Sequence, residues 1–348
     1  MLIHARNVTG LGASQVVRSL IKALIKEMQD KKIIFALPVQ GELSVLEGVE
    51  SKICVKSMLP NALFRVIECL FPRLFYPKMK HNLILGDIPL RGLKDQIVLV
   101  HQSNLTNPNI NPNSSRSMLF KIMRKIFEWN LKDVACVVVQ SDVMKDELLK
   151  SYPVLGERTV VIPQPAPDWF LKPELNTSID KEGLCLFYPA ANYPHKNHRF
   201  IAKLDREGGL DRLEKLIVTL QNEEWIEGLS EQSKIQNAGR LAPQACIDYY
   251  QHVDALFFPS LAESYGLPLV EAMMSGLPIL CSDLPYARWM CEEGAIYFDP
   301  TSVESVKAAI KDLESRLGKG WRPDWRKALS KLPSDWSDVA QAFVRLMK

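Results

Sequence analysis

Short runs of apolar residues alternate along the chain with longer stretches in which apolar positions recur every three or four residues. The short runs are typical of strands buried in a parallel sheet, and the longer stretches are typical of amphipathic helices. The first half predicts strands at Leu2–Ala5, Lys32–Ala36, Asn82–Leu85, Ile97–His101, Val134–Gln140 and Thr159–Ile162. The second half predicts strands at Leu184–Tyr188, Lys215–Thr219, Ile235–Gln236, Ala255–Pro259, Pro278–Cys281 and Ile296–Phe298. With helices such as Ser14–Gln29 and Ser117–Asn130 between them, these two series predict two doubly wound α/β domains.

A proline-rich segment separates the two series. Val161–Asp168 contains three prolines, which favour an extended, stiff connector and do not fit inside a central strand. We therefore predict a first domain over residues 1–165 and a second over residues 166–332. Ligands bind beyond the carboxyl ends of the strands in open parallel sheets, so two sheets that face each other would border a common cleft.

The composition is that of an ordinary globular chain of 348 residues, 47% hydrophobic and 24% charged. No apolar run approaches the roughly 18–20 residues of a membrane span, and the N-terminus lacks a secretory apolar region, so we expect a cytoplasmic protein. The seven cysteines are scattered without a Cys-x-x-Cys pair, which favours reduced thiols and no zinc site.

Positive charge is concentrated in the first half of the chain. Residues 1–170 carry 22 Lys and Arg against 15 Asp and Glu, whereas the remaining residues carry 21 against 25. This bias fits an anionic partner, such as an acceptor phosphate or a membrane surface, and it equally fits unselected variation in surface charge.

Two glutamates, Glu263 and Glu271, lie between two predicted strands of the second domain. Glu263 falls in a loop, and Glu271 falls near the start of a helix that Pro268 opens and Gly276 ends. Backbone N–H groups of residues 265–269 point out of such a helix start and favour an anion. Carboxylates bind vicinal hydroxyls, so the segment suits the ribose, diphosphate and hexose of a nucleotide sugar. Taken singly, each glutamate is also typical of a solvated loop or of a helix start that the macrodipole favours.

The segment Ala262–Asp283 (AESYGLPLVEAMMSGLPILCSD) resembles the signature of retaining glycosyltransferases of the GT-B fold, specifically glycosyltransferase family 4. The resemblance implies two Rossmann-like domains facing across a cleft, with a last helix, Trp336–Met347 within residues 333–348, that crosses back to the first domain. It implies that Glu263 contacts the donor hexose near the reacting carbon and that Glu271 holds the nucleotide ribose. The donor diphosphate would lie at the helix start formed by Tyr265, Gly266 and Leu267.

The segment Tyr188–Asn197 (YPAANYPHKN) resembles the first strand-to-helix loop of the second domain in the same family. Family members carry an Arg and a Lys on the donor diphosphate there. This chain keeps Lys196, but the Arg position falls at Ala191. Lysine neutralises phosphate charge without the planar fork of arginine, and Arg240 is a candidate to compensate. Taken without the resemblance, Lys196 is more typical of a surface lysine.

Four further residues of the first domain are assigned from the resemblance. Gly10 and Gly12 allow close approach of the backbone, and the family loop that they resemble borders the donor phosphates and the acceptor. The same two glycines form only an incomplete dinucleotide fingerprint, which makes a NAD site the weaker interpretation. His101 would lie close to the donor sugar, although a lone histidine is more often structural. Ser141 is placed near the cleft on the acceptor side.

Together with the resemblance, these residues predict a metal-independent hexosyltransferase. Its substrate would be a nucleotide-diphosphate sugar, and it would need no cofactor. No Asp-x-Asp motif for a divalent ion is present, so Lys196 and the helix dipole would balance the phosphate charge. The acceptor would be a saccharide or a polyprenyl-linked saccharide in the synthesis of O-antigen, lipopolysaccharide or capsule, and no nucleic acid is expected. Two alternatives remain: a GT-B sugar-nucleotide epimerase, and a catalytically weak scaffold subunit of a polysaccharide complex, which Ala191 motivates.

Two stretches of the first domain, Leu63–Lys80 and Ser117–Phe127, mix apolar and basic residues. Such segments lie on anionic lipid in peripheral membrane proteins. They are also typical of core-facing helices with a solvated basic face. The sequence therefore leaves open a peripheral contact of the first domain with the inner face of the membrane.

Overall fold

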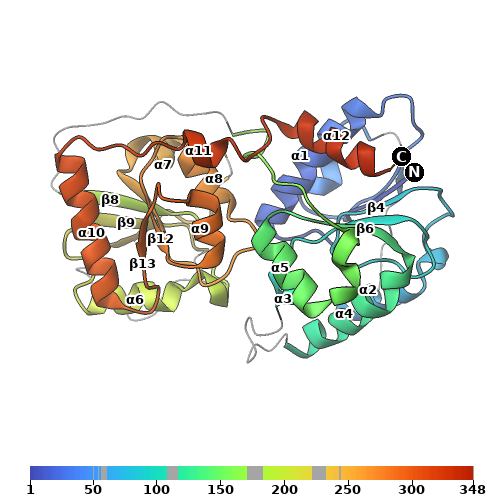
Figure 1. Cartoon of the computed structure of the whole chain (residues 1–348), viewed down its shortest axis with the longest axis horizontal. Helices are drawn as coiled ribbons and strands as arrows, with labels where there is room; N and C mark the ends of the chain where they lie inside the picture. The colour runs from blue at the N-terminus through green and yellow to red at the C-terminus, as the bar shows by residue number, and fades with distance from the viewer. Residues whose placement is uncertain are drawn as a thin grey trace. The chain divides into compact units, whose positions relative to one another are not determined.

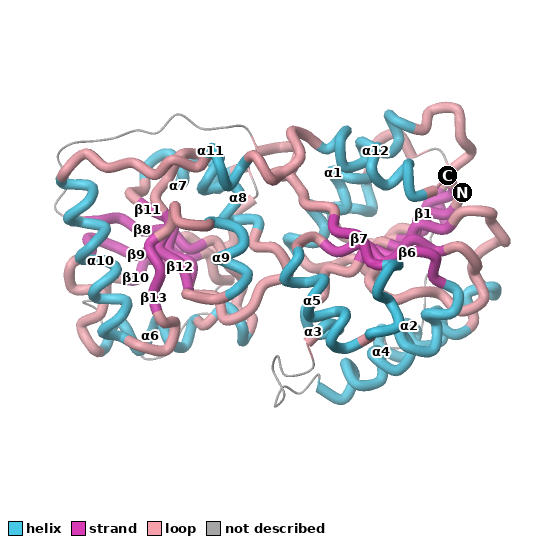
Figure 2. Tube along the Cα trace, viewed as in Figure 1, coloured by secondary structure: helices cyan, strands magenta, loops and turns pink. Residues whose placement is uncertain are grey.

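The computed structural model describes residues 1–49, 51–53, 55, 61–107, 117–170, 183–221, 233–242 and 244–347. The chain divides into two compact units, shown in Figures 1 and 2. Unit 1 comprises Met1–Pro167 and Pro333–Lys348, and unit 2 comprises Asp168–Leu332. Each unit is a parallel sheet covered by helices, as the alternating pattern predicts.

In the described part of unit 1 the strands form one parallel sheet in the order β3-β2-β1-β4-β5-β6-β7. The strands are β1 (Leu2–His4), β2 (Ile34–Ala36), β3 (Lys52–Ile53), β4 (Asn82–Ile84), β5 (Gln96–Leu99), β6 (Val134–Val139) and β7 (Thr159–Val161). The helices are α1 (Leu11–Glu27), α2 (Asn61–Leu70), α3 (Ser103–Thr106), α4 (Ser117–Asn130), α5 (Asp142–Ser151) and α12 (Trp336–Leu346), with short 3-10 turns η1 (Glu42–Val45), η2 (Pro72–Leu74), η3 (Leu131–Asp133) and η4 (Pro153–Arg158).

Unit 2 repeats this design in its described residues, with a parallel sheet in the order β10-β9-β8-β11-β12-β13. The strands are β8 (Leu184–Tyr188), β9 (Leu213–Val218), β10 (Ile235–Asn237), β11 (Ala255–Phe258), β12 (Ile279–Ser282) and β13 (Ile296–Phe298). The helices are α6 (His198–Arg206), α7 (Ala245–His252), α8 (Leu267–Met274), α9 (Pro285–Cys291), α10 (Val303–Gly318) and α11 (Arg326–Leu329), with the 3-10 turn η5 (Pro194–Lys196). Every residue of the central strand β11 is buried, which explains why its sequence is continuously apolar.

The C-terminal helix α12 belongs to unit 1, where it packs against α1. Its buried positions, Trp336, Val339, Ala340 and Phe343, recur at helical spacing and form one apolar stripe. The indole N–H of Trp336 donates to the carbonyl of Ala166 at 2.8 Å. The helix therefore returns to the first unit as the sequence resemblance predicts.

Two of the element bounds that differ from the sequence predictions concern candidate site residues. Helix α1 begins at Leu11 rather than Ser14, because Gly10 has the extended backbone of an N-cap. Gly12 consequently lies inside the helix and not in a loop. Strand β5 ends at Leu99, so His101 follows the strand rather than ending it. The predicted end of α8 is confirmed, because Gly276 has a φ of 74°, as expected for the residue that follows a helix end.

Candidate functional site

The loop between β8 and α6 holds Lys196 in a fixed position at the carboxyl edge of the second sheet. The hydroxyl of Tyr188, at the end of β8, donates to the Lys196 carbonyl at 2.8 Å. Asn197 has a left-handed backbone with a φ of 61°, and its side chain donates to the carbonyls of Pro259 at 3.2 Å and Pro300 at 2.9 Å. These bonds tie the loop to the segments that follow β11 and β13. The sheet therefore places the lysine beside the Glu263 loop.

The structure brings Lys196 and Glu263 into direct contact. The Lys196 ammonium lies 2.5 Å from Oε1 of Glu263, and the two side chains are only 15% and 10% exposed. The ammonium also lies 5.5 Å from the centre of the Phe258 ring, on strand β11. Two residues that are 67 positions apart thus form one partly buried ion pair. The lysine is therefore not the solvated surface side chain that composition alone suggests.

Two aromatic rings stack beside this pair. The rings of Tyr193 and His195 lie 5.7 Å apart and within 4° of parallel, and Tyr193 is 44% exposed. Burial, and then the charge of Lys196, lowers the pKa of His195 to about 4, so its imidazole is neutral near pH 7. The position that carries Arg in the resembling family offers only the carbonyl of Ala191, which lies 3.3 Å from Nε2 of His198.

Helix α8 begins directly after the loop that carries Glu263. Gly266 has a φ of 87° and serves as its N-cap, and no side chain caps the helix start at Leu267. The uncapped N–H groups of this first turn are free of side-chain acceptors and suit an anionic ligand. The side chain of Tyr265 is 3% exposed and lies against Trp289, with ring centres 6.2 Å apart. Tyr265 can therefore serve a ligand only through its backbone.

Glu271 lies one turn into α8 and is almost completely buried, with 7% of its surface exposed. The hydroxyl of Tyr250, on α7, donates to Oε2 of Glu271 at 2.7 Å. Burial raises the pKa of Glu271 to about 7, and the Tyr250 hydrogen bond offsets only part of that rise. A carboxyl that loses hydration to this extent is more typical of a binding or catalytic group than of a helix start stabilised by the macrodipole.

Arg240 is exposed and follows strand β10. Among the hydrogen bonds and ion pairs of the described residues, none joins it to the Lys196–Glu263 pair. The turn before it is closed by Asn237, whose side chain bonds both backbone groups of Leu220 and the N–H of Gly239. Its predicted role in place of the family Arg stays a prediction.

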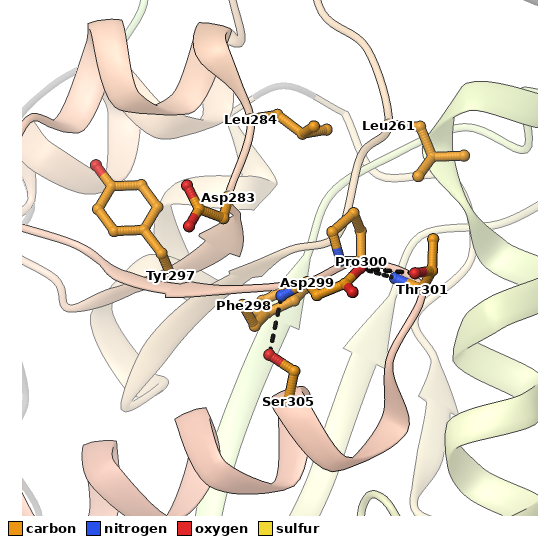
Figure 3. A pocket seen from close by; sticks show the side chains of 9 residues that line it. All are labelled: Leu261, Asp283, Leu284, Tyr297, Phe298, Asp299, Pro300, Thr301 and Ser305. Carbon is orange, nitrogen blue, oxygen red and sulfur yellow. Dashed lines mark hydrogen bonds between the residues drawn. The ribbon is translucent and has the colours of Figure 1, made fainter.

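An open pocket of about 560 Å³ lies next to this site and was not predicted from the sequence (Figure 3). Its lining comprises Leu261, Asp283, Leu284, Tyr297, Phe298, Asp299, Pro300, Thr301 and Ser305. Asp283 pairs with Arg288 at 2.6 Å, and Asp299 accepts from the backbone and hydroxyl of Thr301 at 2.8 and 2.7 Å. Two carboxylates and several hydroxyls at the ends of β12 and β13 suit a hydroxyl-rich ligand.

In unit 1, His101 is held by Asp87. The backbone N–H of His101 donates to Oδ1 of Asp87 at 2.8 Å, and its ring Nε2 lies 3.5 Å from Oδ2. Asp87 has a left-handed backbone with a φ of 68°, a conformation that is costly for a residue other than glycine. Gly10 forms the start of α1 without a side-chain cap, and the hydroxyl of Ser141 caps α5 by accepting from the N–H of Met144 at 3.2 Å. Ser141 therefore has a structural role whatever its position relative to a ligand.

Sequence reasoning missed a buried polar cluster centred on Glu68, on α2. Glu68 is fully buried, and it is contacted by His4 at 3.1 Å, Asn7 at 2.9 Å, Arg65 at 3.3 Å, Arg6 at 3.7 Å and the hydroxyl of Tyr76. Burial alone would raise the pKa of Glu68, but His4, Arg65 and Tyr76 outweigh it and hold the pKa at about 2. The only signal in the sequence was an acidic residue on the core side of an apolar helix.

The described residues contain no group of three or more His, Cys, Asp or Glu side chains arranged to hold a metal ion. None of the helices that the structure describes is long and apolar enough to cross a membrane.

Part of this chain is similar in sequence to known glycosyltransferases. Residues 218–320 match the model of the family described as glycosyl transferases group 1. The O-antigen chain mannosyltransferase RfbU of Salmonella typhimurium is 27% identical over 234 residues, which are 65% of this chain and 62% of the relative. The serotype-specific mannosyltransferase WbdA of Escherichia coli is 31% identical over 72 residues, 21% of this chain and 9% of the relative. The chain thus spans less than two thirds of the length of these relatives.

Solved structures share the fold along nearly the whole chain. WaaG, a glycosyltransferase involved in lipopolysaccharide biosynthesis, has a TM-score of 0.67 at 12% identity and covers 99% of this chain and 95% of its own. Sucrose-phosphate synthase from Thermosynechococcus elongatus has a TM-score of 0.65 at 14% identity, with coverage of 99% and 96%. Anabaena HepE in complex with UDP-glucose has a TM-score of 0.64 at 14% identity, with the same coverage. The predicted GT-B fold is confirmed.

Proposed function

We propose that this chain transfers a hexose from a nucleotide-diphosphate sugar to a saccharide or lipid-linked saccharide, because residues 218–320 match the group 1 glycosyl transferases and the chain has the GT-B fold. Mannose is the hexose to test first, because RfbU and WbdA are both named as mannosyltransferases. The setting that we propose is the synthesis of O-antigen or a related surface polysaccharide, on the cytoplasmic side of the membrane.

The observation that carries the proposal is the Lys196–Glu263 ion pair beside the uncapped start of α8, with Glu271 buried one turn further on. A donor diphosphate placed at this edge would take the charge of Lys196 and the first N–H groups of α8, which stabilise it as it leaves. Glu263, released from the lysine, would then accept hydrogen bonds from the hexose, and Glu271 from the ribose. The site thus exchanges an internal ion pair for contacts with the donor.

Retention of the anomeric configuration is part of the proposal, on the strength of the sequence resemblance. The acceptor hydroxyl would attack from the face that the diphosphate leaves, and no side chain is assigned as a nucleophile. We also propose that transfer needs no metal ion or other cofactor, because Lys196 and the α8 start supply the positive charge. The roles predicted for His101, Gly10, Gly12 and Ser141 stay predictions.

The first test is a thermal-shift series with UDP, GDP, dTDP, CMP and their sugar conjugates, GDP-mannose included, with and without EDTA. A ligand that binds only the native chain raises its melting temperature. We expect one nucleotide to give a shift that EDTA leaves unchanged and that Glu271→Gln removes. Glu304→Gln is the matched control, because Glu304 lies near the start of helix α10 but is 83% exposed. Flat curves for every nucleotide with folded protein would refute the proposal.

Transfer itself is tested by incubating the donor that binds with an extract of lipid-linked saccharides and following release of the nucleoside diphosphate. The one-bond coupling constant between the anomeric carbon and its proton in the product, compared with that of the donor, reports retention or inversion. Neither alternative function is favoured by the comparisons. Isomerisation of the donor without an acceptor would instead indicate an epimerase. A donor-independent contribution to a polysaccharide complex would indicate a scaffold.

A further inference from the structure

Large apolar side chains are exposed in one region of unit 1 far more than elsewhere. Among the described residues, twelve large apolar side chains are markedly exposed, and six of them lie on α2, η2 and α4 or directly beside them. They are Leu63 at 50%, Phe71 at 57%, Leu74 at 73%, Met118 at 66%, Ile122 at 43% and Trp129 at 61%. Scattered single residues of this kind are normal, but a group on adjacent elements marks an interaction surface.

On α4 the exposed apolar residues form a stripe. At about 100° per residue, Met118, Ile122 and Trp129 all project within roughly 40° of one direction. Met123 and Phe127 project from the opposite side of the helix and Ile126 from its flank, and all three are buried in the core. Helix α4 is therefore apolar on its inner face and again on its outer face. The exposed side of α4 thus carries apolar residues in addition to the solvated basic residues expected of a core-facing helix.

Helix α2 and the turn η2 extend this surface. Helices α2 and α4 contact each other and are drawn side by side in Figure 1. The side chains of Phe64 and Cys69 on α2 point into the core, whereas Leu63, Phe71 and Leu74 remain in solvent. Two neighbouring elements thus present apolar side chains that no described residue of unit 1 covers.

Basic residues are placed among these apolar side chains. Lys125 projects within about 20° of Met118, and its side chain is 73% exposed. Lys121 is exposed one turn away on the same helix, and Arg73 is exposed within η2. One acidic side chain, Glu128, is also exposed on α4, and it already pairs with Lys125 at 3.1 Å. The surface therefore combines apolar side chains with an excess of positive charge.

We propose that the surface formed by α2, η2 and α4 binds the headgroup region of an anionic phospholipid membrane. The apolar side chains would enter the interface, while Lys121, Lys125 and Arg73 extend their charged ends to the lipid phosphates. The positive charge favours this occupant over a second copy of the chain, because two such surfaces would repel each other across an apolar contact. Held there, unit 1 would meet an acceptor that is carried by a lipid.

The experiment measures co-sedimentation of the full chain with lipid vesicles. One set contains phosphatidylcholine alone, and in the other about a third of it is replaced by phosphatidylglycerol. Two variants remove one component each: Ile122→Ser with Trp129→Ser, and Lys121→Gln with Lys125→Gln. The controls carry matched changes elsewhere: Val154→Ser, at a residue 68% exposed, and Lys311→Gln with Lys319→Gln on and beside α10. All changed positions are exposed, so folding should be preserved, which circular dichroism checks.

We expect the wild type to bind only the anionic vesicles. The lysine variant should bind roughly 30-fold more weakly and the apolar variant roughly tenfold or more, while both controls bind like the wild type. Failure of the wild type to bind anionic vesicles, or equal binding by all variants, would overturn the proposal. Self-association of the wild type that Ile122→Ser with Trp129→Ser abolishes, without vesicle binding, would mean that the surface is an interface between copies. Vesicle binding needs neither donor nor turnover, so its failure leaves the proposed transferase function intact.

Discussion

Replacing Glu271 by glutamine tests whether its burial has the electrostatic consequence that the structure implies. The amide has the same shape as the protonated carboxyl, and its oxygen can still accept the hydrogen bond that Tyr250 donates at 2.7 Å. The variant therefore removes ionisation with little change in packing. The effect of the substitution on the free energy of unfolding should therefore vary with pH. Its effect on donor binding should not vary with pH in the same way.

The size of the pH effect follows from the two pKa values of the Glu271 carboxyl. The pKa is about 7 in the folded chain and about 4.5 in the unfolded chain. A raised pKa means that the folded state binds the proton more tightly, so its contribution to stability is full below 4.5 and is lost as pH rises through 7. Between pH 5 and pH 8 this single group lowers the free energy of unfolding by about 2.5 kcal/mol.

Urea unfolding of wild type and Glu271→Gln at several pH values measures this difference, followed by the fluorescence of tryptophans such as Trp289 and Trp325 in unit 2. Other groups titrate identically in both chains, so the difference between the two isolates residue 271. The variant should gain about 2.5 kcal/mol relative to wild type from pH 5 to pH 8, yet bind the donor roughly 10- to 100-fold more weakly. If the free energy of unfolding had the same pH dependence in both chains, burial would not raise the pKa of Glu271 and the argument would be refuted.

Three other predictions concern backbone strain and buried charge. Gly266→Ala places a Cβ at a φ of 87° and 3.1 Å from Leu269, so urea unfolding should show a loss of about 1–2 kcal/mol, with weaker donor binding; unchanged stability would contradict the strain. Glu68→Gln leaves its cationic partners unmatched and should cost unit 1 about 3–5 kcal/mol by calorimetry, whereas a loss below about 1 kcal/mol would show that the cluster is unimportant. A double-mutant cycle of Lys196→Met and Glu263→Gln should give a coupling of about 1–3 kcal/mol, and strict additivity would mean that the ion pair is absent in solution.

The individual residues of the site differed in how far the sequence revealed them. Glu263, Lys196 and the start of α8 could be selected because a strand, a loop and a helix follow each other in an order that fixes which edge of the sheet they reach. The ion pair between Lys196 and Glu263 could not be predicted from the sequence, because it forms only when β8 and β11 are neighbours in the sheet. The polar cluster around Glu68 and the pocket lined by Asp283 were not predicted from the sequence for the same reason. Their residues come from segments that are far apart in the chain.

The sequence by itself determined the fold class and the periodic structure of this protein. Short, continuous apolar runs rich in β-branched residues fit strands buried on both faces, and the helical stripes between them then cover those faces. Two parallel α/β units therefore follow from the local pattern. Tertiary structure decided what the polar residues do. Whether Glu271 is solvated or buried, and whether Ile122 and Trp129 face the core or solvent, depends on which elements pack against them. That choice is made by contacts between distant segments, which no local pattern encodes.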